Sequence, residues 1–132
     1  MRTLILTAAI VAAATAAFGQ LETPLKARVP FSFEAAGVDA RAGDCKMTVN
    51  HQGQVRFSTL SGDFLRTGRR DSRATAAVRM VFRNYGDKAV LRAIELGPAG
   101  SVQFDTTATE KSWINLGMTA RVEMVPLVRS AD

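Results

Sequence analysis

Residues 76–96, AAVRMVFRNYGDKAVLRAIEL, hold two apolar stretches joined by a short polar turn. In the first stretch the apolar side chains alternate from Ala76 to Phe82 and share one face, while Arg79 and Arg83 point to the other. The Asn-Tyr-Gly-Asp turn supplies Asn and Gly, which tolerate the positive φ of a tight hairpin turn. The second stretch is apolar on both faces. We therefore predict a β-hairpin whose second strand is central in its sheet or carries a bulge.

The same period of two recurs before and after this hairpin. It predicts further strands at residues 28–34, 45–49, 55–58, 102–104 and 116–124. Pro30 cannot donate a ladder hydrogen bond, so we expect that the first of these strands lies at a sheet edge or that its proline faces solvent. Residues 61–74 are polar and are predicted to form a long loop. Thr107-x-x-Glu110 matches a capping box, which predicts one helical turn up to Trp113.

The fold class that follows is all-β. Short strands with closely spaced turns and no sustained helical period indicate an antiparallel β-sandwich or small barrel of about six to eight strands, after an N-terminal signal helix. The chain has 132 residues, of which 47% are hydrophobic and 22% are charged. It is too apolar for a disordered chain and too short for two ordinary domains.

The first nineteen residues have the three parts of a secretory signal peptide. A positive start at residues 1–3 is followed by an apolar run at residues 4–18. Ala17 and Gly19 then place small residues at the −3 and −1 positions of a cut before Gln20. A membrane anchor is the alternative, but the run is shorter than the about 20 apolar residues that span a bilayer. We therefore expect cleavage.

The expected organisation is a signal peptide at residues 1–19 and a single exported β domain at residues 20–132. The protein is then periplasmic or extracellular and has no stable membrane span after cleavage. Export puts chromosomal nucleic acid out of reach, so we expect no nucleic-acid partner.

Three short motifs are shared with known proteins: Val29-Pro30-Phe31-Ser32-Phe33, Ala42-Gly43 and Tyr85-Gly86-Asp87. With them the chain resembles a family of small exported bacterial proteins of uncharacterised function, which has a Val-Pro-Phe-x-Phe strand, an Ala-Gly hairpin and a Tyr-Gly-Asp turn. The resemblance covers residues 28–96 and implies an exported all-β domain, without implying an activity. The chain departs from the family pattern at Cys45, where the family has Tyr, and at Met47, where it has Val.

Few residues of this chain could carry catalysis or bind a metal. Cys45 and His51 are the only thiol and imidazole, and an extended strand between them would hold them about 20 Å apart. We therefore expect a buried core thiol and a surface turn histidine, with no metal and no cofactor. The carboxylates are scattered, and a hydrolase that uses two of them from distant strands stays open. Tyr85 and Trp113 could stack on sugars, although such residues more often close the end of a sandwich.

Arginines gather in the second half of the chain, which has a formal net charge of +5. Six of them form the candidate anion-binding set, named here the arginine surface: Arg66, Arg69, Arg70, Arg73, Arg79 and Arg83. The first four fall in the predicted loop, and the last two face outward from the neighbouring strand. Guanidinium groups bind phosphate, sulfate and carboxylate bidentately, so a polyanion is the expected partner. Charges that only keep a small exported domain soluble are the alternative.

The leading hypothesis is a non-enzymatic binding or interaction module of the cell envelope. It would contact an envelope polyanion or an envelope protein through its arginine-rich loop. An alternative is a structural or accessory subunit that pairs by edge-strand addition, for which the strand around Pro30 is the candidate edge. A carboxylate-dependent hydrolase is the second alternative.

Overall fold

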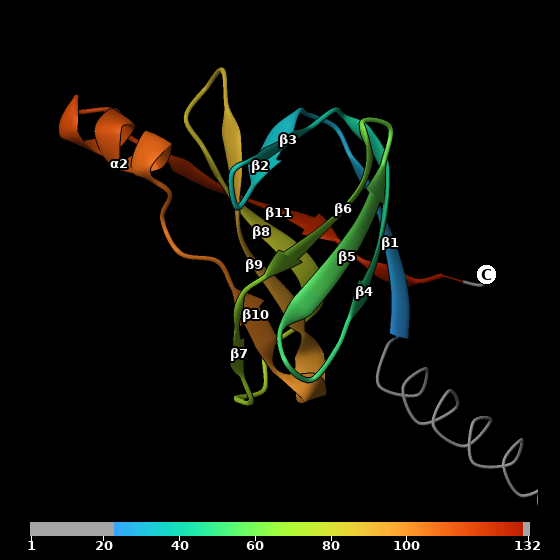
Figure 1. Cartoon of the computed structure of the whole chain (residues 1–132). Helices are drawn as coiled ribbons and strands as arrows, with labels where there is room; N and C mark the ends of the chain where they lie inside the picture. Colours follow the sequence, from blue (N-terminus) through green and yellow to red (C-terminus); the bar gives the residue numbers. More distant parts are fainter. Residues whose placement is uncertain (1–22, 131–132) are drawn as a thin grey trace, which may run out of the picture.

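A computed structural model describes residues 23–130 as two β-sheets that curl into a half-barrel (Figure 1). The predicted signal peptide, residues 1–19, lies outside the described residues. Sheet A has five strands, in the order β12 (Val128–Arg129), β1 (Thr23–Val29), β4 (Gly43–Val49), β5 (Gln54–Thr59) and β6 (Gly62–Thr67). The main path of sheet B runs β11 (Arg121–Pro126), β8 (Val78–Asn84), β9 (Ala89–Leu96), β10 (Ser101–Gln103) and β7 (Arg69–Asp71).

Two short strands complete sheet B. β2 (Phe33–Ala35) pairs in parallel with β9, and β3 (Val38–Ala40) pairs with β2. One α-helix, α2 (Ala108–Asn115), and one 3-10 helix, η1 (Gly97–Ala99), are the helices of the described part. The all-β class is confirmed, although residues 23–130 form twelve strands where about six to eight were expected.

The hairpin predicted in residues 76–96 is present, and the strands predicted at residues 45–49 and 55–58 form a second one. β4 and β5 pair with Met47 opposite Phe57, and β8 and β9 pair with Met80 opposite Ile94. The register of β8 and β9 shifts after Val81, which leaves one extra residue on the β9 side. The second strand of this hairpin is therefore both central and bulged, as its two apolar faces predicted.

The core lies between the two sheets. Phe57 comes from sheet A and Phe82 from sheet B, and both side chains are fully buried. Phe33 packs edge-on against Phe82, with 5.2 Å between ring centroids. Cys45 is also buried, as the alternation of its strand predicted. The period-two pattern thus places one face of each sheet on a common apolar interior.

The chain passes from sheet A to sheet B at Pro30, which corrects the prediction of one strand over residues 28–34. β1 ends at Val29, and β2 begins at Phe33 in the other sheet. Pro30 has no N–H to continue the ladder, so the pairing of β1 ends there. The buried alternation continues through the crossing, which is why the pattern looks like one strand.

Residues 61–74 are not a long loop, which is a second correction. They contain β6 and β7, which lie at the outer edges of sheets A and B. An edge strand with one solvated face keeps few apolar residues, so its period is hard to detect. Gly68 joins the two strands, and a Cβ atom there would lie 2.6 Å from Val102 Cγ1. The chain therefore changes sheets at a position that only glycine fits.

In the last predicted strand the side chains alternate as expected, but the face that was expected to be buried is exposed. Residues 116–120 lie outside β11, and Val122 and Met124 are 59% and 51% exposed. Val125 and Leu127 are buried instead. From Pro126 the chain passes into β12, which pairs with β1 in sheet A.

The capping residue of α2 is the one that the sequence predicted. Thr107 Oγ1 accepts a hydrogen bond from the Glu110 N–H at 3.2 Å. The helix extends beyond the single predicted turn, to Asn115. Figure 1 shows α2 at one corner of the half-barrel, beyond the start of β11.

Candidate ligand-binding site

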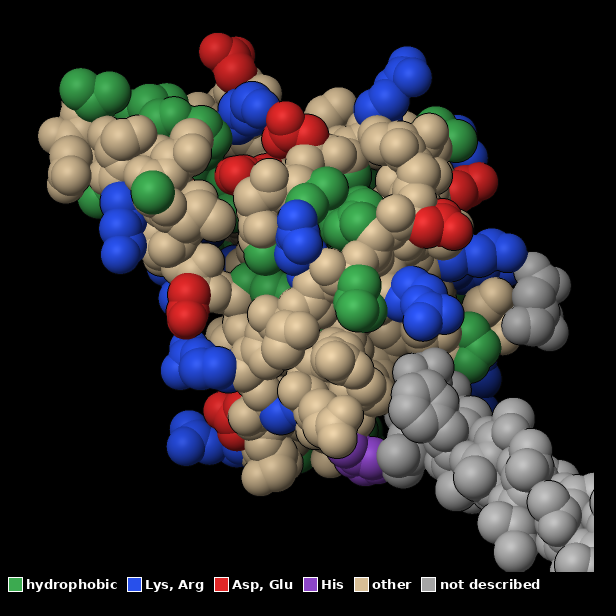
Figure 2. Space-filling view, viewed as in Figure 1, with side chains coloured by type: hydrophobic (Ala, Val, Ile, Leu, Met, Phe, Trp, Pro, Cys, Tyr) green, Lys and Arg blue, Asp and Glu red, His purple; other side chains and the backbone are tan. Residues whose placement is uncertain are grey.

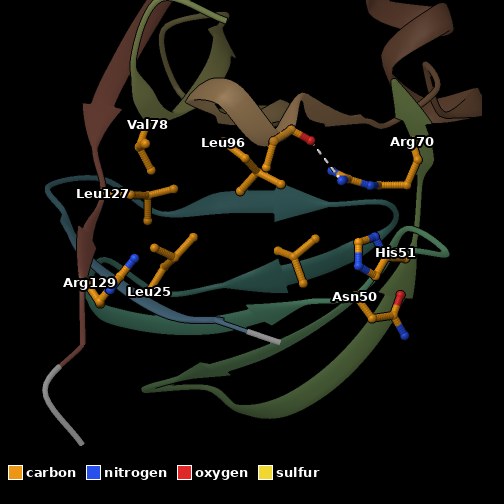
Figure 3. A pocket seen from close by; sticks show the side chains of 10 residues that line it. Leu25, Asn50, His51, Arg70, Val78, Leu96, Leu127 and Arg129 are labelled. Carbon is orange, nitrogen blue, oxygen red and sulfur yellow. Dashed lines mark hydrogen bonds between the residues drawn. The ribbon is translucent and has the colours of Figure 1, made fainter. Parts of the chain in front are cut away.

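A cavity of about 400 Å³ opens between the sheets at one end of the half-barrel. Ten residues from both sheets and from their connecting segments line it (Figure 3): Leu25, Val49, Asn50, His51, Arg70, Val78, Leu96, Ala99, Leu127 and Arg129. Cavities of about 300–1,000 Å³ with apolar walls and a few placed polar groups are typical of small-ligand sites. This cavity is therefore the candidate site.

The apolar wall follows from strand register. Val78 and Leu96 are opposite each other in β8 and β9, so their side chains share the inner face of sheet B. Leu127 is anchored beside them, because its N–H donates to the Val78 carbonyl at 3.1 Å. Leu25 and Val49 come from the inner face of sheet A and are mostly buried. The two sheets thus supply one continuous apolar lining.

Three cationic or ionisable side chains surround this lining. Figure 3 shows Arg70 and His51 at one side of the cavity and Arg129 at the other. Arg70 is opposite Val102 in the β7–β10 ladder, and Val102 is fully buried, so Arg70 faces the inner side of sheet B. Its guanidinium donates to the Ala99 carbonyl at 2.8 Å, which holds the charge beside the cavity.

His51 is placed by a tight turn between β4 and β5. Asn50 is buried, and its Oδ1 accepts hydrogen bonds from the N–H groups of Gln52 and Gln54, each at 3.0 Å. The turn also needs Gly53, whose φ is +84°. Local hydrogen bonds therefore hold the exposed His51 at the edge of the cavity.

The polar groups of the lining are basic or neutral, and none is acidic. The ten lining residues include no Asp, Glu, Ser, Thr, Cys or Tyr, so they offer no acidic group and no nucleophilic hydroxyl or thiol. Two arginines provide fixed positive charge. An apolar body with one anionic end matches this combination, because the body fills the lining and the anion meets guanidinium groups.

Among residues 23–130, no helix is long and apolar enough to cross a bilayer. No group of three or more His, Cys, Asp or Glu side chains in that part of the chain is arranged to hold a metal ion. Comparisons with protein-family models, with curated proteins and with solved structures found no match.

The arginine surface is divided by strand geometry. Arg69 and Arg70 are neighbours in β7, so their side chains point to opposite sides of sheet B. Arg70 points inward to the cavity. Arg69 is opposite Gln103 and points to the other side, where its Nη2 lies 3.4 Å from Asp105 Oδ1. Both residues belong to strand β7, so the prediction that they lie in an arginine-rich loop is wrong.

Arg79 and Arg83 share the outer face of β8, as predicted, but each faces a carboxylate. Arg79 Nε donates to Glu95 Oε1 at 2.6 Å, and both side chains are largely shielded from solvent. Arg83 Nη1 lies 3.8 Å from Glu110 Oε2. These two arginines are therefore largely committed to partners within the domain.

Arg66 and Arg73 lie apart from both pairs. Arg66 is in β6 opposite the buried Val55, so it faces the inner side of sheet A. Arg73 is exposed beyond the end of β7. On the face of the molecule drawn in Figure 2, Lys and Arg side chains are spread out, with acidic side chains between them. The six arginines are not gathered on one face, and Arg70 is the one that lines the cavity.

Sequence analysis missed a cluster of ionisable groups on the outer side of sheet B. Glu110 is 1% exposed, and its Oε2 accepts a hydrogen bond from the Tyr85 hydroxyl at 2.6 Å. Its Oε1 is buried without a hydrogen-bond partner among the described residues. The Trp113 ring packs edge-on against Tyr85, with 5.3 Å between centroids. The capping-box pattern identified Glu110 but not this use of its carboxylate.

Glu34 in β2 belongs to the same cluster. It is 8% exposed, and its Oε2 is buried with no hydrogen-bond partner in the described part of the chain. Burial, and then the charge of Asp39, raise the pKa of Glu34, and Glu110 adds to this while Lys88 opposes it. Burial, and then the hydrogen bond to Glu110, raise the pKa of Tyr85. Neither glutamate lines the candidate cavity.

Cys45 and His51 are separated as predicted, one in the core and one in a turn. The thiol is 1% exposed, and burial raises its pKa to about 12. His51 is exposed at the rim of the cavity. A deeply buried thiol with so high a pKa has almost no thiolate at neutral pH, so this pair is not arranged for nucleophilic catalysis.

Proposed function

We propose that the protein is an exported, non-enzymatic binding module of the cell envelope, and that its ligand is a small anion with an apolar body. The cavity between the sheets carries this proposal. Its wall is apolar, and its polar rim is cationic or neutral. An anionic ligand would replace water around Arg70 and Arg129, while its apolar part would bury against Leu25, Val78 and Leu127.

This proposal keeps a negatively charged partner, replaces the polyanion expected from the sequence with a small anion, and moves the binding site. Arg79 already has a carboxylate partner, and Arg69 faces away from the interior. Arg70 combines a guanidinium group with an adjoining apolar cavity. A polyanion held on the exposed surface needs Arg69 and Arg70 alike, whereas the cavity needs Arg70 and not Arg69.

Two neighbouring variants separate these possibilities. Titration calorimetry with decanoate, an anion with an apolar chain, measures binding to the protein, to Arg70→Met and to Arg69→Met. We expect Arg70→Met to weaken decanoate binding about tenfold, which corresponds to the loss of one charge-assisted hydrogen bond. Arg69→Met should bind like the parent protein, because its side chain is on the opposite face of the same strand.

Decanol, which has the same chain length and no charge, is the ligand control. Decanol should bind with equal affinity to Arg70→Met and to Arg69→Met. Val78→Phe fills the cavity and should abolish binding of both ligands, while circular dichroism shows that the fold is kept. If decanoate does not bind, or if Arg69→Met weakens it as much as Arg70→Met does, the cavity is not the site.

Export is tested separately. Expression of the full chain in a bacterium, followed by cell fractionation and mass spectrometry, should find the protein outside the cytoplasm with Gln20 as its first residue. Recovery of the uncleaved chain from the cytoplasm would contradict this part of the proposal.

A further inference from the structure

β11 is an edge strand of sheet B. Within residues 23–130 it pairs with β8 on one side, and no described strand pairs with its other side. The backbone N–H and C=O groups on that second side can therefore pair with another strand. This edge differs from the one around Pro30 that the sequence suggested, where β2 is paired with both β3 and β9.

Exposed apolar side chains gather beside this edge. Among the described residues, eight large apolar side chains are exposed, and five of them lie between residues 114 and 124: Ile114, Leu116, Met118, Val122 and Met124. Figure 2 shows hydrophobic side chains gathered over the α2 corner of the molecule. Single exposed apolar residues are ordinary, but a gathering of them marks an interaction surface.

The charges of β11 are arranged in a self-complementary way. Arg121 and Glu123 lie two residues apart and so share one face of the strand, with Arg121 Nη2 at 3.0 Å from Glu123 Oε1. The opposite face carries Val122 and Met124. An antiparallel second copy of this segment presents the same residues in reverse order, so opposite charges can meet across a two-fold axis.

We propose that two copies of the chain associate by antiparallel pairing of their β11 strands, with Val122 of each copy at the two-fold axis. In this register Arg121 of each copy is opposite Glu123 of the other. Val122 stacks on its own counterpart, and Met124 is opposite Ala120. Sheet B then continues across the axis, which brings the apolar side chains of β11 against those of the second copy and satisfies its free backbone groups.

The charges select this register over its neighbour. If Glu123 were at the two-fold axis, two carboxylates would be directly opposite each other, which destabilises an antiparallel pair. With Val122 at the axis, the pairing contains two oppositely charged pairs and one β-branched pair. Pro126 ends β11 and lacks an N–H, so the pairing is expected to stop before it.

Sedimentation velocity of the purified protein over a wide concentration range tests the proposal. We expect a monomer–dimer equilibrium. Arg121→Glu alone and Glu123→Arg alone each place like charges opposite, and each should raise the dimer dissociation constant by about tenfold or more. The double variant Arg121→Glu/Glu123→Arg restores opposite charges across the axis and should recover the parent dissociation constant to within about threefold.

Cysteine cross-linking fixes the register. Val122→Cys should form a disulfide-linked dimer on mild oxidation, because the two side chains face each other at the axis. Met124→Cys is the matched control and should stay unlinked, since its counterpart lies several residues away along the paired strands. Cys45 does not compete, because its side chain is buried.

A protein that stays monomeric at all concentrations overturns the proposal. So does a dimer that is unaffected by both single charge variants, or one that cross-links through Met124→Cys rather than through Val122→Cys. Val122 and Met124 do not line the cavity. Loss of dimerisation in these variants can therefore be told apart from loss of decanoate binding.

Discussion

The Tyr85 hydroxyl donates a hydrogen bond to Glu110 Oε2 over 2.6 Å, and this contact joins the β8–β9 turn to α2. Glu110 is the buried residue of that helix, while its apolar residue Ile114 is 44% exposed. Trp113 supports the contact by packing against the Tyr85 ring. The helix is thus attached to sheet B by the contacts of Glu110 with Tyr85 and Arg83 and by one aromatic pair, rather than by an apolar face.

Tyr85→Phe removes this donor from Glu110 Oε2, while the other carboxylate oxygen, Oε1, already has no hydrogen-bond partner among the described residues. We expect the free energy of unfolding to fall by about 1–3 kcal/mol, the usual cost of an unsatisfied buried polar group. In hydrogen exchange, the α2 amide of Lys111 should lose protection more than the amides of β8. In a Glu110→Gln background the same substitution should cost less, and an equal cost in both backgrounds would show that the bond is not coupled to Glu110.

Glu34→Gln should stabilise the protein at neutral pH. Because burial raises the pKa of Glu34, the folded state binds its proton more tightly than the unfolded state does. The parent protein therefore loses stability as pH rises through the folded-state pKa, whereas the glutamine variant keeps its neutral side chain. Urea titrations should show the difference at pH 7 and its disappearance below the ordinary carboxyl pKa of 4.5. A variant that is less stable than the parent at pH 7 would contradict the expected penalty.

The Cys45 thiol should be unreactive in the folded protein. Burial leaves it 1% exposed and raises its pKa to about 12, so neither access nor thiolate is available to an alkylating reagent at pH 8. We expect labelling by iodoacetamide only as fast as the protein unfolds, and complete labelling in denaturant. Rapid labelling under native conditions would place the thiol outside the core.

Gly53→Ala and Gly117→Ala form a matched pair, because both glycines have a φ of +84°. Both substitutions force alanine into the left-handed region at a cost of about 1–2 kcal/mol. A Cβ atom at Gly53 would also lie 2.3 Å from the Gly68 carbonyl oxygen, whereas at Gly117 it meets nothing within 4 Å. Thermal unfolding should therefore show a larger loss for Gly53→Ala, beyond about 3 kcal/mol. Equal losses would mean that the Gly53–Gly68 approach relaxes freely.

The sequence predicted the parts of the fold in which local pattern and burial agree. The hairpin that turns at Tyr85-Gly86-Asp87 was predicted correctly. The buried side chains of its first strand, its turn residues and the two apolar faces of its second strand all require the same arrangement. The strand that contains Cys45 is correct for the same reason. Thr107 was identified as a cap because capping depends on residues only three positions apart.

Other features depend on contacts that are distant in sequence. An alternating pattern does not say which face is inward, so Val122 and Met124 looked like core residues although they oppose the outward face of β8. Arg70 could not be separated from Arg69 until the pairing of β7 with β10 was known. The cavity combines Leu25, from the first described strand, with residues more than 70 positions later, such as Leu127. No local pattern contains that information.

The pairing of β12 with β1 determines when the domain can be completed. Leu25 is opposite Arg129, and Lys26 is opposite Val128, so the first and last described strands are neighbours in one sheet. A growing chain therefore cannot finish sheet A until residues 128–129 have been synthesised. Closing so long a stretch of chain is entropically slow, which gives such topologies low folding rates. Until residues 128–129 are available, sheet A lacks the strand that borders β1, so shorter nascent chains cannot adopt the complete fold.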